Sequence, residues 1–168
     1  MKTLKRRRRE KKTDYGKRLG LLKGNVPRVV FRKSNKYLIA QYIVSSEAQD
    51  SVVFGVTSKI LLKNRWPEDM RGSLKSLPAA YLTGFYLGRK ILEKNLQTPI
   101  IDFGVMRIVS KSRAFAFILG LVDSGVKIKH KKETFPEEEK IHGKKLKRDF
   151  SVFFKMVKAK INDVEEEK

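Results

Sequence analysis

The side chains that could do chemistry in this sequence are carboxylates and cations, because the chain has no cysteine and only two histidines. A thiolate zinc site, a cysteine nucleophile and a disulfide framework are therefore excluded. His130 and His142 stand twelve residues apart in a charged segment, where a lone histidine is far more often a surface residue than a ligand. We assign them no role. No glycine-rich phosphate loop followed by Lys-Ser or Lys-Thr is present either.

Carboxylates offer one enzymatic hypothesis. Asp102 follows a strand-like segment and could bind magnesium together with Asp123 and with Asp50 or Glu47, since two-metal phosphoryl chemistry needs clustered carboxylates. Their spacing does not indicate a cluster, because Asp102 can cap a turn and Asp123 lies near the end of a predicted helix. We therefore predict a protein that is not an enzyme and has no cofactor, no metal and no small-molecule substrate. A metal-dependent nuclease of α/β type using Asp102 and Asp123 is the alternative.

Cations dominate the chain: its 168 residues include 39 Lys or Arg against 18 Asp or Glu, a net charge of +21. Residues 1–36 hold 15 of the cations against Glu10 and Asp14, a net charge of +13. Residues 5–12 include no apolar side chain, so we expect this arm to repel itself and stay unfolded until it meets a polyanion. Phosphate contacts by Lys and Arg release counterions and can supply much of the binding free energy.

The residues beside the cations indicate which polyanion. Thr13, Tyr15, Ser34, Asn35 and Tyr37 are short hydrogen-bonding or phenolic side chains, which can bond a 2′-hydroxyl or stack on an unpaired base. This mixture favours structured RNA, and no helix-turn-helix or zinc-finger pattern argues for duplex DNA. A generic polyanion or membrane-surface binder is the remaining alternative, although the arm has no apolar face to insert into a bilayer.

Apolar stretches are too short for a membrane span. The longest run without a charge, residues 76–88, has 13 residues, whereas a spanning helix needs about 20. No apolar run follows the basic N-terminus, so a secretory signal is not expected. The sequence predicts a cytoplasmic protein with no membrane partner.

The elements of the first half follow from local patterns. Thr13 can cap a short amphipathic helix, with Asp14 in its first turn, that we expect to order on contact with its partner. Residues 28–32 and 37–43 read as a β-hairpin with a turn at Ser34 and Asn35. Period 2 places Val29 and Phe31 on one face and Arg28, Val30 and Arg32 on the other, so two guanidinium groups should project together. Residues 51–56 are a plausible third strand.

The second half alternates strand and helix. Its predicted elements are a buried helix over 78–95 with Pro78 at its first position, a strand over 99–103, a helix over 113–124 and a short strand over 126–128. Ser112 can cap the second helix and Gly125 can end it. Gly84 and Gly88, one turn apart, should permit close packing on a sheet. A helix start at 135–139 and a terminal helix marked by residues 150–161 follow.

The fold class is therefore α/β, with three parts: the arm and short helix (1–24), an α/β body (25–130) and a helical C-terminal extension (131–168).

Several motifs, in order, resemble the archaeal and eukaryotic-type family of large-subunit ribosomal proteins that bind 5S rRNA, the eighteenth large-subunit protein in the universal nomenclature. They comprise residues 6–10, 13–15, 18–19, 21–23, 27–28, 32–36, 40–41 and 78–84, then Asp102, Gly104, Asp123, Gly125 and pieces of 130–143. The resemblance spans about residues 6–145. We recognise no family pattern over 105–110 or from Lys144 onward.

The resemblance implies a non-enzymatic α/β domain with a mixed β-sheet, held on 5S rRNA in the central protuberance by its basic N-terminal segment and the adjoining sheet surface. Its partners would be 5S rRNA, large-subunit rRNA and a neighbouring 5S-binding ribosomal protein. Asp102 would be structural, and Thr13, Tyr15, Ser34 and Asn35 would make finer RNA contacts. The phosphate-contact candidates are Arg6, Arg7, Arg8, Arg9, Lys11, Lys12, Arg18, Lys23, Arg28, Arg32, Lys33 and Lys36.

Overall fold

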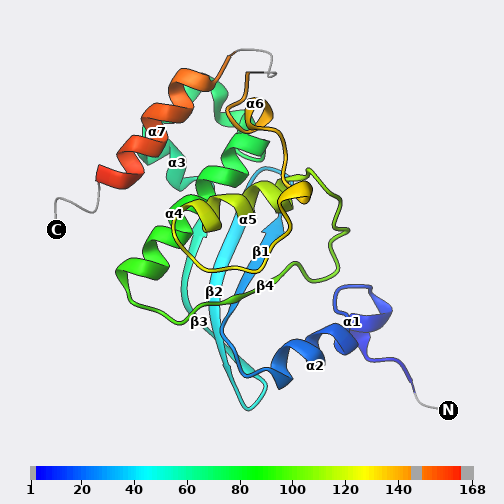
Figure 1. Cartoon of the computed structure of the whole chain (residues 1–168). Coiled ribbons are helices and arrows are strands. Elements are labelled where there is room, and N and C mark those ends of the chain that lie inside the picture. The colour runs from blue at the N-terminus through cyan, green and yellow to red at the C-terminus, as the bar shows by residue number, and fades with distance from the viewer. Residues whose placement is uncertain (1–2, 145–148, 164–168) are drawn as a thin grey trace.

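A four-stranded mixed sheet forms the centre of the molecule (Figure 1). The computed structural model describes residues 3–144 and 149–163, so the first two residues of the predicted arm and parts of the predicted C-terminal extension lie outside it. Strand order is β3-β2-β1-β4. β1 pairs antiparallel with β2 and parallel with β4, while β2 pairs antiparallel with β3. The expected α/β class with a mixed sheet is confirmed. The strands are β1 (Arg28–Lys33), β2 (Leu38–Ser46), β3 (Gln49–Thr57) and β4 (Ile100–Asp102).

The predicted hairpin and its two faces are confirmed. Val29 pairs with Tyr42 and Phe31 with Ala40, and all four side chains are buried on the face covered by helices. Successive side chains of a strand alternate between faces, so Arg28 and Arg32 lie on the opposite face.

Two long helices cover one face of the sheet, α4 (Leu77–Glu93) and α5 (Arg113–Asp123). The Ser76 hydroxyl caps α4 by accepting the Ala79 N–H at 3.4 Å, so Pro78 stands second in the helix rather than first. The predicted packing of α4 glycines on a sheet is wrong, because they face α5. A Cβ at Gly84 would collide with the carbonyl of Phe117, on α5.

The two α-helices after residue 130 that the structure describes pack onto α4. α7 (Ser151–Asp163) follows Phe150, whose ring lies 4.4 Å from that of Trp66, and buries Phe154 and Val157. The strand predicted over 126–128 is wrong: Gly125, at φ +104°, ends α5, and the segment has no strand pairing. The short elements are α3 (Ile60–Lys63), η1 (Glu68–Ser73), η2 (Lys132–Thr134) and α6 (Glu138–Ile141).

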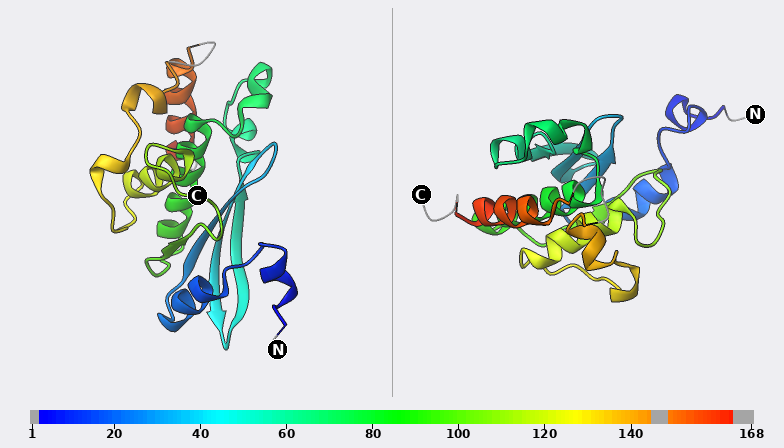
Figure 2. Two further views of the ribbon diagram at one scale, coloured as in Figure 1. Left: turned by 90° about the vertical axis from the view of Figure 1, so that its right-hand side faces the viewer. Right: turned by 90° about the horizontal axis from the view of Figure 1, so that it is seen from above.

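The N-terminal helix α1 (Arg6–Arg9) lies on the other side of the sheet from α4 and α5 (Figure 2). Helix α2 (Tyr15–Lys23) contacts the same face, because its Arg18 binds Asp50, which also binds Arg28. The sheet therefore separates a helical layer from a basic N-terminal segment. Among the described residues, no helix combines the length and the apolar character that crossing a bilayer requires.

Candidate nucleic-acid interface

The basic arm forms one helical turn, α1, rather than the fully unfolded segment expected from its charge. Glu10 pairs with Arg6 at 3.7 Å and with Lys12 at 2.8 Å. The backbone carbonyl of Arg7 accepts the N–H groups of Lys12 and Thr13. These local bonds offset part of the repulsion among the cations. The expectation of an unfolded arm considered that repulsion but not these bonds. The predicted phosphate-contact residues of the arm are all exposed: Arg6, Arg7, Arg8, Arg9, Lys11 and Lys12.

Helix α2 begins one residue later than predicted, because Asp14 rather than Thr13 is its N-cap. The Asp14 carboxylate accepts the Lys17 N–H at 3.1 Å. Thr13 has a different role: its hydroxyl accepts the Arg7 Nε–H at 2.9 Å and so links the arm to the start of the helix. Tyr15 is half-buried, with the Lys5 ammonium 4.7 Å from its ring centroid. Lys23, at the end of α2, is exposed.

Polar contacts from one turn of α2 hold this helix against the sheet. Arg18 pairs with Asp50 of β3 at 2.9 Å and also donates to the Ala48 carbonyl. Lys17 donates to the carbonyl of Gly104, just after β4, at 3.3 Å. The helix thus contacts the sheet surface at two separated points, which fixes its direction.

Arg28, a predicted phosphate contact, is buried at 2% exposure on the sheet face that carries α2. Its guanidinium lies 2.6 Å from Asp50, 2.8 Å from the Ser45 hydroxyl and 3.5 Å from Asp102. Burial would raise the pKa of Asp50, but hydrogen bonds from Arg18 and Ser45 and the charges of Arg28 and Arg18 outweigh it, so that pKa lies below the ordinary value. Arg28 therefore binds carboxylates of its own chain.

Arg32 remains accessible and shares Asp102 with Arg28, so the two guanidinium groups do project together as predicted. It donates to the backbone carbonyls of Phe31 and Asp102, both at 2.9 Å, and lies 3.6 Å from the Asp102 carboxylate. Asp102 also accepts the Gly104 N–H at 2.6 Å. These bonds give Asp102 a structural role.

The hairpin turn presents the remaining candidates. Ser34 is committed to the turn, because its hydroxyl donates to the Tyr37 carbonyl at 2.8 Å and accepts the Tyr37 N–H at 2.9 Å. The Asn35 carbonyl accepts from the Lys75 ammonium at 2.8 Å, which leaves the Asn35 amide side chain exposed. Lys33 and Lys36 are exposed on either side of this turn.

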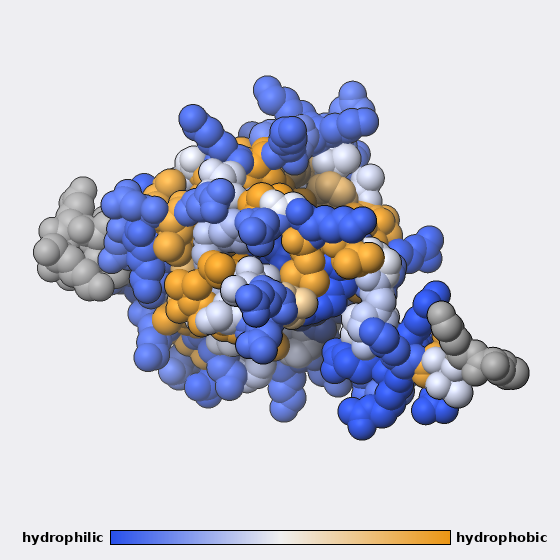
Figure 3. All heavy atoms as spheres, turned by 90° about the horizontal axis from the view of Figure 1, so that it is seen from below, coloured by the Kyte–Doolittle hydropathy of each residue, from blue (hydrophilic) through white to orange (hydrophobic). Residues whose placement is uncertain are grey.

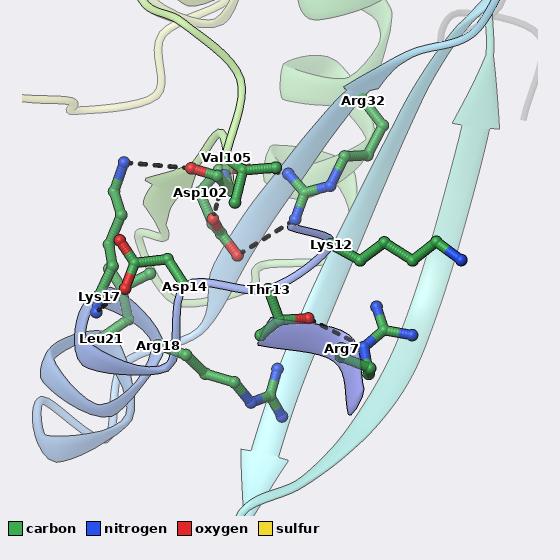
Figure 4. Close-up of a pocket in the computed structure, with 11 residues that line it drawn as sticks. Arg7, Lys12, Thr13, Asp14, Lys17, Arg18, Leu21, Arg32, Asp102 and Val105 are labelled. Carbon is green, nitrogen blue, oxygen red and sulfur yellow. Dashed lines mark hydrogen bonds and ion pairs between the residues drawn. The ribbon is translucent and has the colours of Figure 1, made fainter. Parts of the chain in front are cut away.

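A hollow of about 150 Å³ lies between the arm, α2 and the sheet (Figure 4). Two carboxylates line it, and both are engaged: Asp14 caps α2, and Asp102 binds Arg28, Arg32 and Gly104. The cations that line it outnumber these carboxylates, so its electrostatic potential suits a phosphate group. They are Arg7, Lys12, Lys17, Arg18 and Arg32.

Sequence reasoning missed two cations of this surface. Lys17 lines the hollow, and its only local signal is its place three residues after the true N-cap, in the first turn of a short helix. Lys75 supports the hairpin turn from 40 residues away, and no sequence pattern announces such a contact.

The carboxylates of the nuclease alternative serve other purposes. Asp50 and Asp102 flank the Arg28 guanidinium, whereas Asp123 accepts the Tyr81 hydroxyl at 2.6 Å, and Tyr81 in turn accepts from Lys158 at 2.7 Å. Burial, followed by the hydrogen bond and charge of Asp123, raises the pKa of Tyr81. In the part of the chain that the structure describes, no group of three or more His, Cys, Asp or Glu side chains could hold a metal. The cluster that the nuclease alternative requires is therefore contradicted, and the prediction that Asp102 and Asp123 serve separate purposes agrees with these contacts.

Comparisons with known proteins agree with this geometry. A family model described as "Ribosomal large subunit proteins 60S L5, and 50S L18" matches residues 1–99. The large ribosomal subunit protein uL18 of Korarchaeum cryptofilum is 41% identical over 138 residues, which cover 82% of this chain and 69% of the relative. The protein of the same name from Caldivirga maquilingensis is 39% identical over 139 residues, covering 82% of this chain and 65% of the relative.

Proposed function

Because this chain belongs to the family of ribosomal large subunit proteins 60S L5 and 50S L18, we propose that its basic arm and the adjoining sheet surface bind 5S rRNA. The chain is a structural constituent of the large ribosomal subunit, in the cytoplasm, and not an enzyme. Its partners include rRNA.

One observation carries the proposal: the exposed cations of the arm and of α2 gather on the side of the sheet that α4 and α5 leave uncovered. Figure 3 shows the arm projecting from the body as a region coloured almost entirely hydrophilic. An exposed cationic projection beside a hollow lined by Arg7, Arg18 and Arg32 suits the closely spaced phosphates of a folded RNA.

Within this interface we assign different roles to the predicted residues. The exposed cations contact phosphates, whereas Arg28, buried among carboxylates, positions β3 and α2 through Asp50. Thr13 keeps its hydroxyl proton available for a donor bond, because the oxygen already accepts from Arg7. Tyr15 and the exposed amide of Asn35 are the candidates for contacts that distinguish one RNA from another. Ser34 supports the turn.

The proposed assembly has further members. We propose that large-subunit rRNA contacts the mildly basic remainder of the chain, residues 37–168, whose net charge is +8. The third proposed partner is a neighbouring 5S-binding ribosomal protein. In this arrangement residues 1–24 are the arm, 25–130 the body and 131–168 a C-terminal extension that packs against the body through Phe150 and α7.

The experiment that tests the proposal is recovery of the tagged full-length chain from cells, followed by sequencing of the RNA that it retains. We expect enrichment of 5S rRNA over other small RNAs of similar length. An Arg6 to Arg9 quadruple alanine variant, expressed at the same level, should retain much less of it. Recovery of random RNA fragments by the unaltered chain would contradict the proposal and leave a generic polyanion binder.

A further inference from the structure

A second hollow, of about 310 Å³, lies on the helical side of the sheet, between β1 and the starts of α4 and α5. Its floor is apolar and comes from Phe31, Leu77, Met106 and Ala114. It shares no lining residue with the first hollow, and of the proposed phosphate-contact residues it includes Lys33 alone.

Cations form the rim of this hollow: Lys33, Arg107, Lys111 and Arg113 all line it. Lys111 lies 4.0 Å from Glu137, and within the described residues the other three have no carboxylate at ion-pair distance. An apolar floor with a positive rim suits an occupant that carries both apolar and acidic side chains.

The loop beside the hollow exposes two branched aliphatic side chains. Ile108 and Val109 are 44% and 51% exposed, whereas the exposed Val105 lines the first hollow. Ile108 and Val109 stand between the lining residues Arg107 and Lys111, so the apolar surface continues along this loop. Contiguous exposed apolar surface rimmed by polar residues marks a protein contact.

The same hollow is poorly suited to RNA. The Phe31 ring is 1% exposed and packs against Phe117, with centroids 4.5 Å apart, and edge-on against Phe103 at 5.9 Å. Its face is therefore unavailable for a base, and the other floor residues are not aromatic. RNA sites that bind unpaired bases depend on such stacking, and aliphatic loop residues do not replace it.

We infer that this hollow and the adjoining loop, residues 107–109, dock an acidic, amphipathic segment of a neighbouring ribosomal protein, whose apolar side chain fills the floor while its carboxylates meet Arg107, Lys111 and Arg113. The inference rests on the proposed function for the presence of a protein neighbour, and adds the surface and the chemistry of the contact. The partner binds on the helical side while RNA binds across the sheet, so both can be held at once.

Site-specific photo-crosslinking in purified large subunits tests this inference. The full-length, tagged chain carries a photoreactive residue at Ile108, and large subunits that contain it are isolated and irradiated. We expect a crosslink to one ribosomal protein, at a peptide containing both apolar and acidic residues. A matched chain with the photoreactive residue at Val152, an exposed aliphatic position on α7, should not capture that peptide.

Charge reversal separates a specific contact from mere proximity. Arg107→Glu with Lys111→Glu should lower the crosslink yield about tenfold, because like charges would then face each other. Lys127→Glu with Lys129→Glu, exposed residues that do not line the hollow, should not lower it. A crosslink to rRNA, to a peptide without carboxylates, or to nothing overturns the inference, even if 5S rRNA is retained. If the chain is absent from large subunits, the proposed function fails and this inference falls with it.

Discussion

At the level of single residues, Arg28 shows how burial changes the role of a cation. Its guanidinium binds Asp50, Ser45 and Asp102, and Asp50 in turn binds Arg18 of α2. The two ion pairs, Arg28 with Asp50 and Asp50 with Arg18, therefore link β1 to α2. Arg28 thus contributes to binding by fixing the geometry of other cations.

Removing the Arg28 charge should destabilise the fold. Arg28→Met leaves the Asp50 and Asp102 carboxylates without their shared partner, and loss of one member of a buried ion network costs about 3–5 kcal/mol. Urea unfolding followed by circular dichroism measures the change. Arg71→Met is the control, because Arg71 is exposed and should change stability by less than about 0.5 kcal/mol. Equal effects of the two variants would refute the positioning role of Arg28.

Asp50 should make stability depend on pH in the acid range. Its pKa in the folded chain lies below the ordinary value of 3.8, so its stabilising effect is complete above about pH 4 and is lost as pH falls through the folded-state pKa. Asp50→Asn should therefore lose less stability between about pH 5 and pH 3 than the unaltered chain. Urea unfolding at several pH values measures this loss. The control is Glu47→Gln, which removes an exposed carboxylate at the turn between β2 and β3. Its stability should depend on pH as that of the unaltered chain does.

At the level of elements, close helix packing fixes the body that carries the interface. α4 and α5 meet through glycines, and a Cβ on Gly120 would collide with the Tyr81 carbonyl and lie 2.8 Å from the Phe85 nitrogen. Both atoms belong to the backbone of α4, which is buried and cannot be displaced without moving the whole helix. The spacing of Gly84 and Gly88 predicted a close backbone contact but assigned it to the sheet rather than to α5, because a pair of glycines does not reveal which element packs against it.

Two glycine substitutions should have opposite effects. Gly120→Ala should destabilise the fold by about 1–3 kcal/mol through overpacking. Gly20→Ala, in α2 where a Cβ meets nothing within 4 Å, should stabilise it by up to about 1 kcal/mol through helix propensity. Thermal and urea unfolding of both variants compare them directly. Destabilisation by Gly20→Ala would indicate that α2 does not keep this conformation.

Local patterns explain which elements could be predicted. The hairpin, α4, α5 and α7 follow from periodicity and caps, and the candidate cations from charge runs. The false strand over 126–128 arose because alternating Val126, Lys127 and Ile128 mimic a strand, although this segment pairs with none of the four strands of the sheet. The burial of Arg28 could not be predicted, because it depends on Asp102, which is brought beside it by the parallel pairing of β4. Whether a residue is buried or a segment pairs as a strand thus depends on contacts between segments that are distant in the sequence.

At the level of the whole molecule, charge and shape separate two binding sides. The arm and α2 form a cationic projection on one side of the sheet, and the helical side carries the hollow proposed for a protein neighbour. This division explains how a small chain can hold an RNA and still contact the rest of a large particle.

RNA affinity should depend steeply on salt. If the arm, α2 and the hairpin turn make about 6–8 phosphate contacts, the logarithm of the binding constant should fall against the logarithm of salt concentration with a slope of roughly −4 to −7. Replacing Arg6 to Arg9 by alanine should flatten this slope by roughly 3 units. Filter binding at several salt concentrations measures it. A slope near −1 for the unaltered chain would exclude a multi-phosphate interface.

The most direct test of the central claim is a competition between 5S rRNA and an RNA of the same length and composition but shuffled sequence. Both RNAs are titrated against the full-length chain at about physiological salt. We predict that 5S rRNA binds at least about 100-fold more tightly, because the arm supplies affinity for any RNA and the positioned side chains around it supply the preference. Equal affinity for the two RNAs would contradict the account.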